Sequence, residues 1–253
     1  MKFLIFKKKN LKYLFIMAIT LVLLSLNING SSAQVYFGIA PRLVPIYSVD
    51  TEEKKVAITF DSAWGADKTM RIIEILQEYD VDATFFLVGF WVEKYPDMVK
   101  ALYDNGIEIG THSNTHADFK NLDASQMELE LTTSMDLIEN VTGEKPTLFR
   151  APYGSYNNTV ISTATSLGLK TIQWDVDTLD WKGYSSMDIC NRVLNTVKEG
   201  SIILCHNNSD HILEALPLML ERLKLKGYTV TSVGNLIYQE DYTVDNLGIQ
   251  RKN

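Results

Sequence analysis

From Lys54 onward, short apolar segments alternate with longer segments of helical periodicity, and this alternation limits the possible folds more than any other feature. The apolar segments favour β-strands because they are rich in β-branched and aromatic residues. They cover residues 56–60, 83–87, 107–110, 147–149, 171–174, 202–205 and 229–231. Helices are predicted at residues 68–78, 98–105, 125–141, 158–167, 187–198 and 211–226. Strands that are each followed by a helix predict an α/β protein of parallel βα units, either a doubly wound open sheet or a closed barrel.

The N-terminal residues have the order of a secretory signal. Lysines at positions 2, 7, 8, 9 and 12 precede an apolar run over residues 13–26, and small residues follow at 31–33. This order predicts export with cleavage after Ala33, and an uncleaved membrane anchor over residues 1–33 is the alternative. Positive charge ahead of the apolar run predicts that the rest of the chain crosses the membrane.

The charge of the exported part excludes one class of partner. Removing these five lysines from a formal net charge of −7 leaves −12 for the remainder. An acidic body is a poor nucleic-acid binder, so we expect no nucleic-acid partner and membrane contact only through the N-terminal segment. Cys190 and Cys205 are the only cysteines, and we expect two buried, reduced thiols rather than a disulfide framework. The sequence does not indicate an oligomeric state.

Composition divides the rest of the chain into three parts. Residues 34–53 show no clear period and contain two prolines, so we expect a linker or an edge segment there. Residues 54–238 hold all the predicted strands and helices and should form the folded domain. Residues 239–253 are polar, and we expect a loosely ordered tail.

Reactive side chains follow the predicted strands at the point where each strand ends. They are Asp61, His112, His116, Arg150, Asp177, Asp180 and His206. In parallel βα folds the loops at the carboxyl ends of the strands build the active site, so these side chains should meet at one end of the sheet. His112 and His116 are four positions apart, a spacing that can place two imidazoles close enough to share a metal ion.

Five short segments occur in a fixed order along the chain. They are Thr59-Phe60-Asp61, His112-Ser113-x-x-His116, Arg150-Ala151-Pro152-Tyr153, Asp177-x-x-Asp180-Trp181 and Leu204-x-His206. These segments resemble the five motifs of the polysaccharide deacetylases, the carbohydrate esterase family 4 enzymes that carry the NodB homology domain. The resemblance covers residues 54–238, and the run Asp61-Ser62-Ala63-Trp64-Gly65 is similar to the sporulation-associated branch. It implies a distorted (β/α)₇ barrel of the NodB type that removes N-acetyl groups from an aminosugar polymer.

The resemblance also implies a role for four charged residues. Asp61 is expected to be the general base. Arg150 is expected to hold Asp61 ionised and oriented through charge-assisted hydrogen bonds. His206 is expected to protonate the leaving nitrogen, with Asp177 raising its pKa as a nearby carboxylate does.

Substrate contacts are expected from four further residues. The backbone N–H of Tyr153 has the position that faces the oxyanion in the family. Leu204 should lie on the same strand face as His206, and with Trp181 it could enclose the acetyl methyl group. Trp64 either stacks on a sugar ring at the rim or belongs to the core.

A divalent metal ion is expected on His112 and His116, with zinc first and cobalt or another divalent ion as alternatives. Most family members carry a second aspartate as the third ligand, and this chain has Ser62 there. A hydroxyl is a weaker ligand than a carboxylate. Three outcomes stay open: water fills the vacant position, Asp61 itself ligates the ion, or the ion binds weakly and catalysis is slow or absent.

Three functions are compatible with these observations. The leading hypothesis is an exported N-deacetylase of the cell envelope that acts on peptidoglycan, with chitin-type oligomers as a weaker alternative. Ser62 motivates a second hypothesis, an envelope protein that binds glycan through a weak or inactive site. The third is a small-molecule amide hydrolase, against which the export signal argues.

Overall fold

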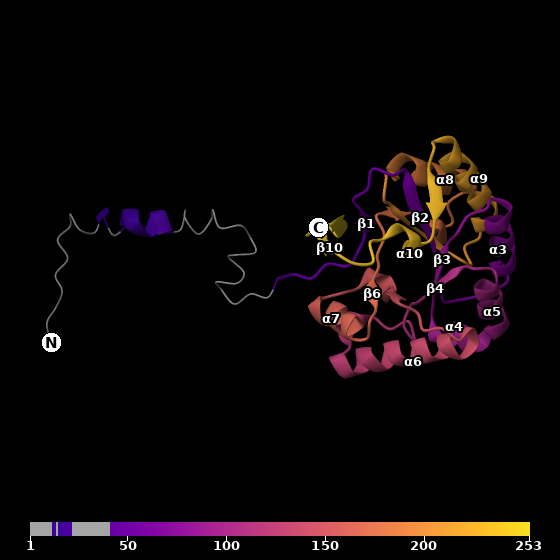
Figure 1. Ribbon diagram of the computed structural model, residues 1–253, viewed down its shortest axis with the longest axis horizontal. Helices are drawn as coiled ribbons and strands as arrows, with labels where there is room; N and C mark the ends of the chain where they lie inside the picture. The colour runs from indigo at the N-terminus through magenta and orange to yellow at the C-terminus, as the bar shows by residue number, and fades with distance from the viewer. Residues whose placement is uncertain (1–11, 14, 22–40) are drawn as a thin grey trace. The chain divides into compact units, whose positions relative to one another are not determined.

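The computed structural model describes residues 12–13, 15–21 and 41–253 (Figure 1). The chain divides into two units, Met1–Arg42 and Leu43–Asn253, and the second holds the predicted strands and helices. The expected signal peptide or anchor at residues 1–33 lies outside the described residues, apart from positions 12–13 and 15–21. Within the described ranges, no helix combines the length and the apolar character needed to span a bilayer.

A parallel sheet forms the centre of the second unit (Figure 1). Its strands are β2 (Lys55–Ser62), β3 (Thr84–Leu87), β4 (Glu108–Thr111), β5 (Leu148–Phe149), β6 (Lys170–Thr171), β7 (Val176–Asp177) and β8 (Ile202–His206). Their spatial order is β6-β5-β4-β3-β2-β8-β7, and every pairing in it is parallel. β9 (Thr229–Thr231) pairs with the first residues of β2. This arrangement confirms the predicted α/β class and the (β/α)₇ barrel. The barrel is distorted because β6 and β7 stand at the two ends of the strand order instead of pairing with each other.

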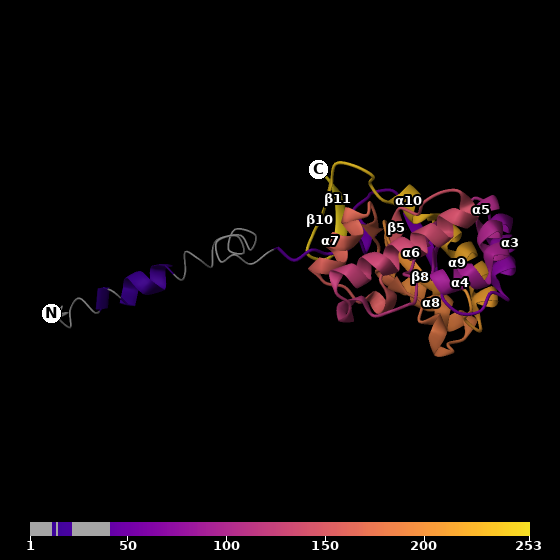
Figure 2. The same cartoon turned by 90° about the horizontal axis from the view of Figure 1, so that it is seen from below.

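Helices lie around the outside of this sheet, except the short α10 (Val233–Leu236), which packs in one cluster with Ala57 of β2 (Figures 1 and 2). They are α3 (Thr69–Glu78), α4 (Gly89–Lys94), α5 (Pro96–Asp104), α6 (Ala124–Thr142), α7 (Asn158–Ser166), α8 (Ser186–Thr196), α9 (Ile212–Leu225) and α10 (Val233–Leu236). The six helices expected from the sequence are present. The sequence did not predict α4 and α10, since helices of six and four residues are too short to show a helical period.

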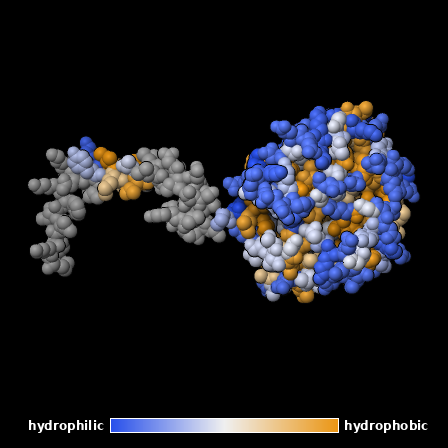
Figure 3. All heavy atoms as spheres, viewed as in Figure 1, coloured by the Kyte–Doolittle hydropathy of each residue, from blue (hydrophilic) through white to orange (hydrophobic). Residues whose placement is uncertain are grey.

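The strands are buried on both faces, and alternate side chains along each strand face two different clusters. Ile58 and Phe60 of β2 belong to a large cluster with the helices, whereas Ala57 belongs to a second cluster inside the barrel. Because side chains alternate along a strand, Asp61 shares the inner face with Ala57. Cys205 of β8 lies in the helix-facing cluster, which confirms that it packs in the core. Figure 3 shows that the outer surface in this view is mostly hydrophilic, with hydrophobic residues in small patches.

The longest of these helices, α6, has a defined end on each side. The Asp123 side chain accepts a hydrogen bond from Gln126 N, and the Gln126 side chain accepts one from Asp123 N, which is a capping box. The helix stops at Gly143, whose φ of 80° is readily adopted only by glycine. These caps fix the ends of a helix that packs beside α4 and the loop after β4.

The segment before β2 is part of the folded unit. Of the two alternatives expected at residues 34–53, the edge segment fits the described part, because β1 lies at the edge of a small sheet, and residues 34–40 lie outside the described residues. Ile46 forms a parallel bridge with Ile172, next to β6, and Ser48 forms an antiparallel bridge with Ser201, next to β8. The segment therefore connects the β6 side of the sheet to the β8 side. Two nearby prolines interrupt the apolar period and hide this role in the sequence.

The C-terminal residues are also ordered, which corrects the loose tail expected at residues 239–253. They form a second sheet with the segment before β2, and its strands are β1 (Ser48–Val49), β11 (Ile249–Lys252) and β10 (Tyr242–Val244) (Figure 2). Gln250 is fully buried, and its side chain donates to Tyr238 O and accepts from Tyr238 N, each at 2.8 Å. The buried side chain of this strand is a polar glutamine whose hydrogen bonds are made to the backbone. The sequence therefore shows no apolar residue there that would predict a buried strand.

We predict that Gln250→Ala lowers the free energy of unfolding by about 1–3 kcal/mol, because it leaves the N–H and C=O groups of Tyr238 without these partners. Urea unfolding followed by circular dichroism measures the change. Lys252→Ala removes an exposed side chain of the same strand and should change stability by less than about 0.5 kcal/mol. Equal stability of wild type and Gln250→Ala would contradict a structural role for the C-terminal sheet.

Candidate active site

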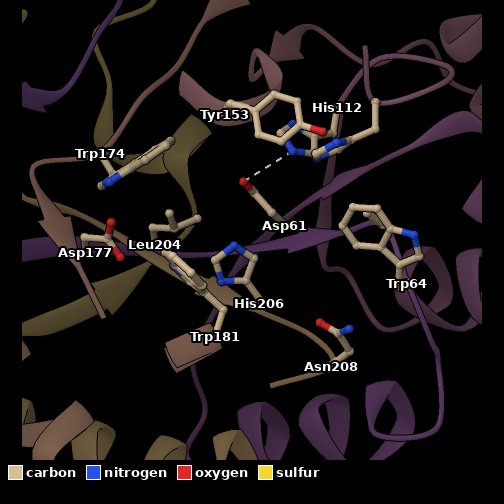
Figure 4. A pocket seen from close by; sticks show the side chains of 12 residues that line it. Asp61, Trp64, His112, Tyr153, Trp174, Asp177, Trp181, Leu204, His206 and Asn208 are labelled. Carbon is tan, nitrogen blue, oxygen red and sulfur yellow. Dashed lines mark ion pairs between the residues drawn. The ribbon is translucent and has the colours of Figure 1, made fainter. Parts of the chain in front are cut away.

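A cavity of about 570 Å³ lies where the central strands end (Figure 4). Most of the expected site residues line it: Asp61, Trp64, His112, His116, Tyr153, Asp177, Trp181, Leu204 and His206. Arg150 and Ser62 are fully buried and do not line the cavity. The sequence did not single out Ala63, Trp174 and Asn208, which also line it.

Arg150 holds Asp61 in this cavity, and the expected contact between them is present. Nη1 of Arg150 donates to Asp61 Oδ1 and to Thr59 Oγ1, each at 2.8 Å, and Nη2 donates to Gln173 O at 3.1 Å. The guanidinium carbon lies 4.1 Å from the centre of the Phe86 ring. Because the whole side chain is buried, water screens this ion pair little.

The surrounding charges favour the ionised form of Asp61. Burial alone raises the pKa of this carboxyl group, but the positive charge of Arg150 and the electrostatic influence of the His112 and His206 rings together lower the pKa below its ordinary value of 3.8. The Arg150 hydrogen bond acts in the same direction. Asp61 is therefore a carboxylate at neutral pH.

His112 presents an unprotonated nitrogen to the cavity. Its Nδ1 lies 2.7 Å from the carbonyl oxygen of Arg150, and because a carbonyl oxygen only accepts, Nδ1 carries the hydrogen. Nε2 then has the lone pair, and it lies 3.5 Å from Asp61 Oδ2 (Figure 4, dashed line). Burial is the largest influence on the pKa of His112 and lowers it, which favours the neutral ring.

His116 is surrounded by three rings. Its centroid lies 5.0 Å from that of Trp64, 4.7 Å from that of Tyr153 and 5.0 Å from that of His112. Burial and, second, the neighbouring His112 ring lower the pKa of His116 to about 4. Its Nδ1 is buried without a hydrogen-bond partner. The ring is therefore neutral at neutral pH.

The two imidazoles suit a divalent metal ion, but the usual carboxylate beside them is absent. Metal ions bind neutral imidazole nitrogens, and both rings offer one. Ser62 is buried with an Oγ that has no hydrogen-bond partner. Over residues 41–253 and the few described before them, no three side chains of His, Cys, Asp and Glu are grouped closely enough to hold an ion. The residues thus fit an ion through two nitrogens, while the unsatisfied Ser62 hydroxyl is buried outside the cavity lining.

The carboxylate that contacts His206 is Asp180, to which the sequence assigned no role, whereas Asp177 acts on His206 through its charge. Asp180 Oδ1 lies 2.7 Å from His206 Nδ1, and Oδ2 accepts from the His206 backbone N–H at 2.8 Å. Burial lowers the pKa of His206, but the hydrogen bond and charge of Asp180 and the charges of Asp61 and Asp177 raise it above 6.5 overall. Asp177 acts in the expected direction, but it is the weakest of these influences.

Asp177 also stabilises the turn that follows β7. Its Oδ1 accepts from Leu179 N at 2.8 Å, and Leu179 has a left-handed φ of 51°. This turn brings Asp180 back toward β8, where its side chain is 1% exposed. The sequence contains both aspartates in one motif before Trp181, but spacing alone does not show which of them turns inward.

Aromatic side chains form the open part of the cavity. Trp64, Tyr153 and Trp181 are 58%, 70% and 60% exposed, so their rings are accessible to a ligand. Leu204 is 3% exposed and precedes His206 by two residues on β8, on the expected face. Figure 4 shows Trp181 beside His206 and Trp64 on the side of Asn208. The cavity thus combines charged groups with rings at its mouth.

Comparisons of sequence relate this arrangement to known proteins. The family model described as polysaccharide deacetylase matches residues 48–172. A peptidoglycan-N-acetylglucosamine deacetylase of Bacillus cereus is 33% identical over 196 residues, which are 76% of this chain and 92% of that protein. The uncharacterized protein YlxY of Bacillus subtilis is 34% identical over 193 residues. That match covers 76% of this chain but only 60% of the length of YlxY.

A comparison of structures gives a similar result. The crystal structure of BA3943 from Bacillus anthracis, described as a CE4 family pseudoenzyme, superposes with a TM-score of 0.74 at 36% identity, over 76% of this chain and 68% of that one. A mutant of BA3943 described as having restored enzymatic activity superposes with the same TM-score at 38% identity, over 76% and 71% of the two chains.

We predict that Asp180→Asn lowers the pKa of His206, because the neutral amide no longer stabilises the imidazolium. NMR titration of the imidazole resonances measures this pKa, with the His206 signal assigned by its loss in His206→Ala. Asp177→Asn is the matched control and should lower the pKa by less. A larger shift in Asp177→Asn than in Asp180→Asn would restore Asp177 as the principal partner.

Proposed function

Because this chain belongs to the polysaccharide deacetylase family, we propose that it hydrolytically removes N-acetyl groups from aminosugars of a cell-wall polysaccharide, with peptidoglycan as the polymer. One observation carries the proposal. Asp61 and His206 are register partners on adjacent strands and line the same cavity. Their surroundings favour an ionised carboxylate and a protonated imidazole, which are the base and the acid that amide hydrolysis needs.

Asp61 acts as the general base. It takes a proton from the water that attacks the acetyl carbonyl carbon, and the new C–O bond turns the carbonyl oxygen into an oxyanion. Arg150 keeps Asp61 ionised and fixes its Oδ1, so Oδ2 is the oxygen that remains for the water. The backbone N–H of Tyr153 is the proposed donor to the oxyanion.

His206 acts as the general acid. Its Nδ1 is engaged by Asp180, which leaves Nε2 to deliver a proton to the sugar nitrogen. With this proton transfer the C–N bond breaks, and acetate and a free amine are the products. Asp180 is thus the orienting partner of the acid, and Asp177 supports it electrostatically.

The remaining lining residues are proposed to hold the sugar. Leu204 and Trp181 enclose the acetyl methyl group, because Leu204 is nearly buried beside His206 while Trp181 is open. Trp64 offers an exposed ring on the opposite side for stacking on a sugar. An apolar pocket with a few polar groups is typical of a small ligand site.

His112 and His116 are the residues that would hold a divalent ion, with zinc favoured by two imidazole ligands and cobalt or another divalent ion as alternatives. When bound, such an ion polarises an acetyl carbonyl and lowers the pKa of a bound water. A third protein ligand would be Asp61 Oδ2, which lies 3.5 Å from His112 Nε2 and would then no longer be free to act as the base; otherwise water would take that position. Binding weaker than in a site with a second carboxylate is expected.

A second candidate function follows from Ser62. The hydroxyl replaces a ligand, and the chain is similar to BA3943, which is described as a pseudoenzyme. The candidate is an envelope protein that binds glycan in this cavity without turnover. The complete set of Asp61, Arg150, Asp180 and His206 favours the enzyme, because a site used only for binding has no need of a paired acid and base.

The location is proposed from the same relatives and from the sequence. A cell-wall substrate places the protein in the envelope or outside the cell, and the N-terminal order of lysines and apolar residues supports export. The N-terminal segment is the only membrane contact proposed. A sporulation role is supported only by the resemblance of residues 61–65 to that branch.

We predict that metal-stripped protein releases acetate from N-acetylated peptidoglycan once a suitable divalent ion is restored, with zinc, cobalt and other ions added singly. Asp61→Asn and His206→Ala should each lower the rate at least about 100-fold, because each removes a proton-transfer group. His211→Ala is the matched control, since His211 is a partly exposed histidine outside the cavity, and it should keep the wild-type rate.

Two results would count against this account. Full activity of Asp61→Asn or His206→Ala would overturn the roles assigned to these residues. No acetate from folded protein with any ion, together with saturable glycan binding that survives His206→Ala, would establish the binding protein instead.

We also predict that Ser62→Asp tightens metal binding by about tenfold or more, since loss of even an outer partner of a metal ligand costs about 10- to 100-fold. The Ser62 hydroxyl has no partner, so the substitution breaks no hydrogen bond. Calorimetric titration with zinc measures the affinity, and Ser62→Ala should leave it near the wild-type value. Unchanged affinity in Ser62→Asp would mean that position 62 does not face the ion.

A further inference from the structure

The loop that joins the two histidines has a strained backbone. Ser113 and His116 have φ angles of 73° and 60°, in the left-handed region that side chains other than glycine rarely adopt. Inside the loop, Ser113 Oγ accepts from His116 N at 2.9 Å. Such a conformation persists only when its surroundings hold it in place.

One side of the loop rests on the start of α4. Gly89 N donates to Ser113 O at 2.9 Å, and Phe90 N donates to Asn114 O at 3.2 Å. The approach is close enough that a Cβ on Gly89 would lie 3.0 Å from Asn114 Cα and closer still to its side chain. The first N–H groups of a helix need acceptors, and the loop carbonyls supply them.

The other side of the loop is held by a single carboxylate from α6. Glu130 Oε2 accepts from Asn114 N at 2.9 Å and from Thr115 N at 2.8 Å. Glu130 Oε1 accepts from Thr115 Oγ1 at 2.6 Å. The two consecutive backbone N–H groups in the middle of the loop therefore donate to one side chain, which lies 14 residues beyond His116 in the sequence.

We propose that Glu130 is a positioning residue for the metal site. By holding the amides of Asn114 and Thr115 it keeps the loop in the conformation that brings His112 and His116 within 5.0 Å of each other, ring to ring. The two ligands are thus arranged before an ion arrives, and binding does not have to order the loop. The inference rests on the proposed function to the extent that the histidine pair is a metal site.

The test compares Glu130→Ala and Glu130→Gln with Glu128→Ala, an exposed glutamate on the same helix, in the full chain. Each change is made in wild type and in Ser62→Asp. Calorimetric titration with zinc gives the affinity, and thermal unfolding without metal gives the stability. Hydrogen exchange of the Asn114 and Thr115 amides reports on the loop itself. We expect Glu130→Ala to weaken zinc binding by about 10- to 100-fold and to speed exchange of these two amides.

Glu130→Gln keeps one oxygen acceptor, so it should recover part of the affinity, and Glu128→Ala should match its parent. Because the titrations are done well below the unfolding temperature, a general loss of stability would lower the number of sites and not their affinity. Equal zinc affinity and unchanged exchange in Glu130→Ala would overturn the proposal. If neither wild type nor Ser62→Asp bound any divalent ion, the metal part of the proposed function would fail, and unchanged exchange would separately refute the loop-holding role of Glu130.

Discussion

The buried contact between Arg150 and Asp61 is the interaction on which the rest of the site depends. The guanidinium of Arg150 holds the carboxylate of Asp61, and the backbone carbonyl oxygen of Arg150 accepts a hydrogen bond from His112 Nδ1. Arg150 thereby sets both the ionisation of the proposed base and the tautomer of a proposed metal ligand. Breaking a buried ion pair from one side leaves an uncompensated charge, at a cost of about 3–5 kcal/mol, so the arrangement tolerates little change.

The opposite side of the cavity is organised independently. His206 depends on Asp180, which the turn after β7 brings to it, and this pair shares no hydrogen bond with Arg150. The parallel register of β2 and β8 places Asp61 and His206 side by side on neighbouring strands. Asp61, whose surroundings favour the anion, and His206, whose surroundings favour the cation, thus have separate supporting partners and face one cavity. This is the arrangement of a base and an acid.

The sequence predicted the elements whose signals are local and regular. The βα alternation, and the position of Asp61 and His206 after apolar strands, were sufficient to place them at one end of a parallel sheet. The choice of Asp180 over Asp177 could not be predicted, because it depends on the left-handed turn at Leu179. The segment around Ile46 that connects the two sides of the sheet was also missed, because its pairing partners are more than 100 residues away in the chain.

The central claim is that Asp61 is an ionised carboxylate held by Arg150 inside the cavity. The most direct measurement is the ¹³C chemical shift of the Asp61 carboxyl carbon between pH 7 and pH 3, with the signal assigned by its absence in Asp61→Asn. The account predicts a folded protein in which this carboxyl group titrates below 3.8, its ordinary value. A midpoint above that value would mean that burial outweighs the positive charges around Asp61, and it would contradict the account.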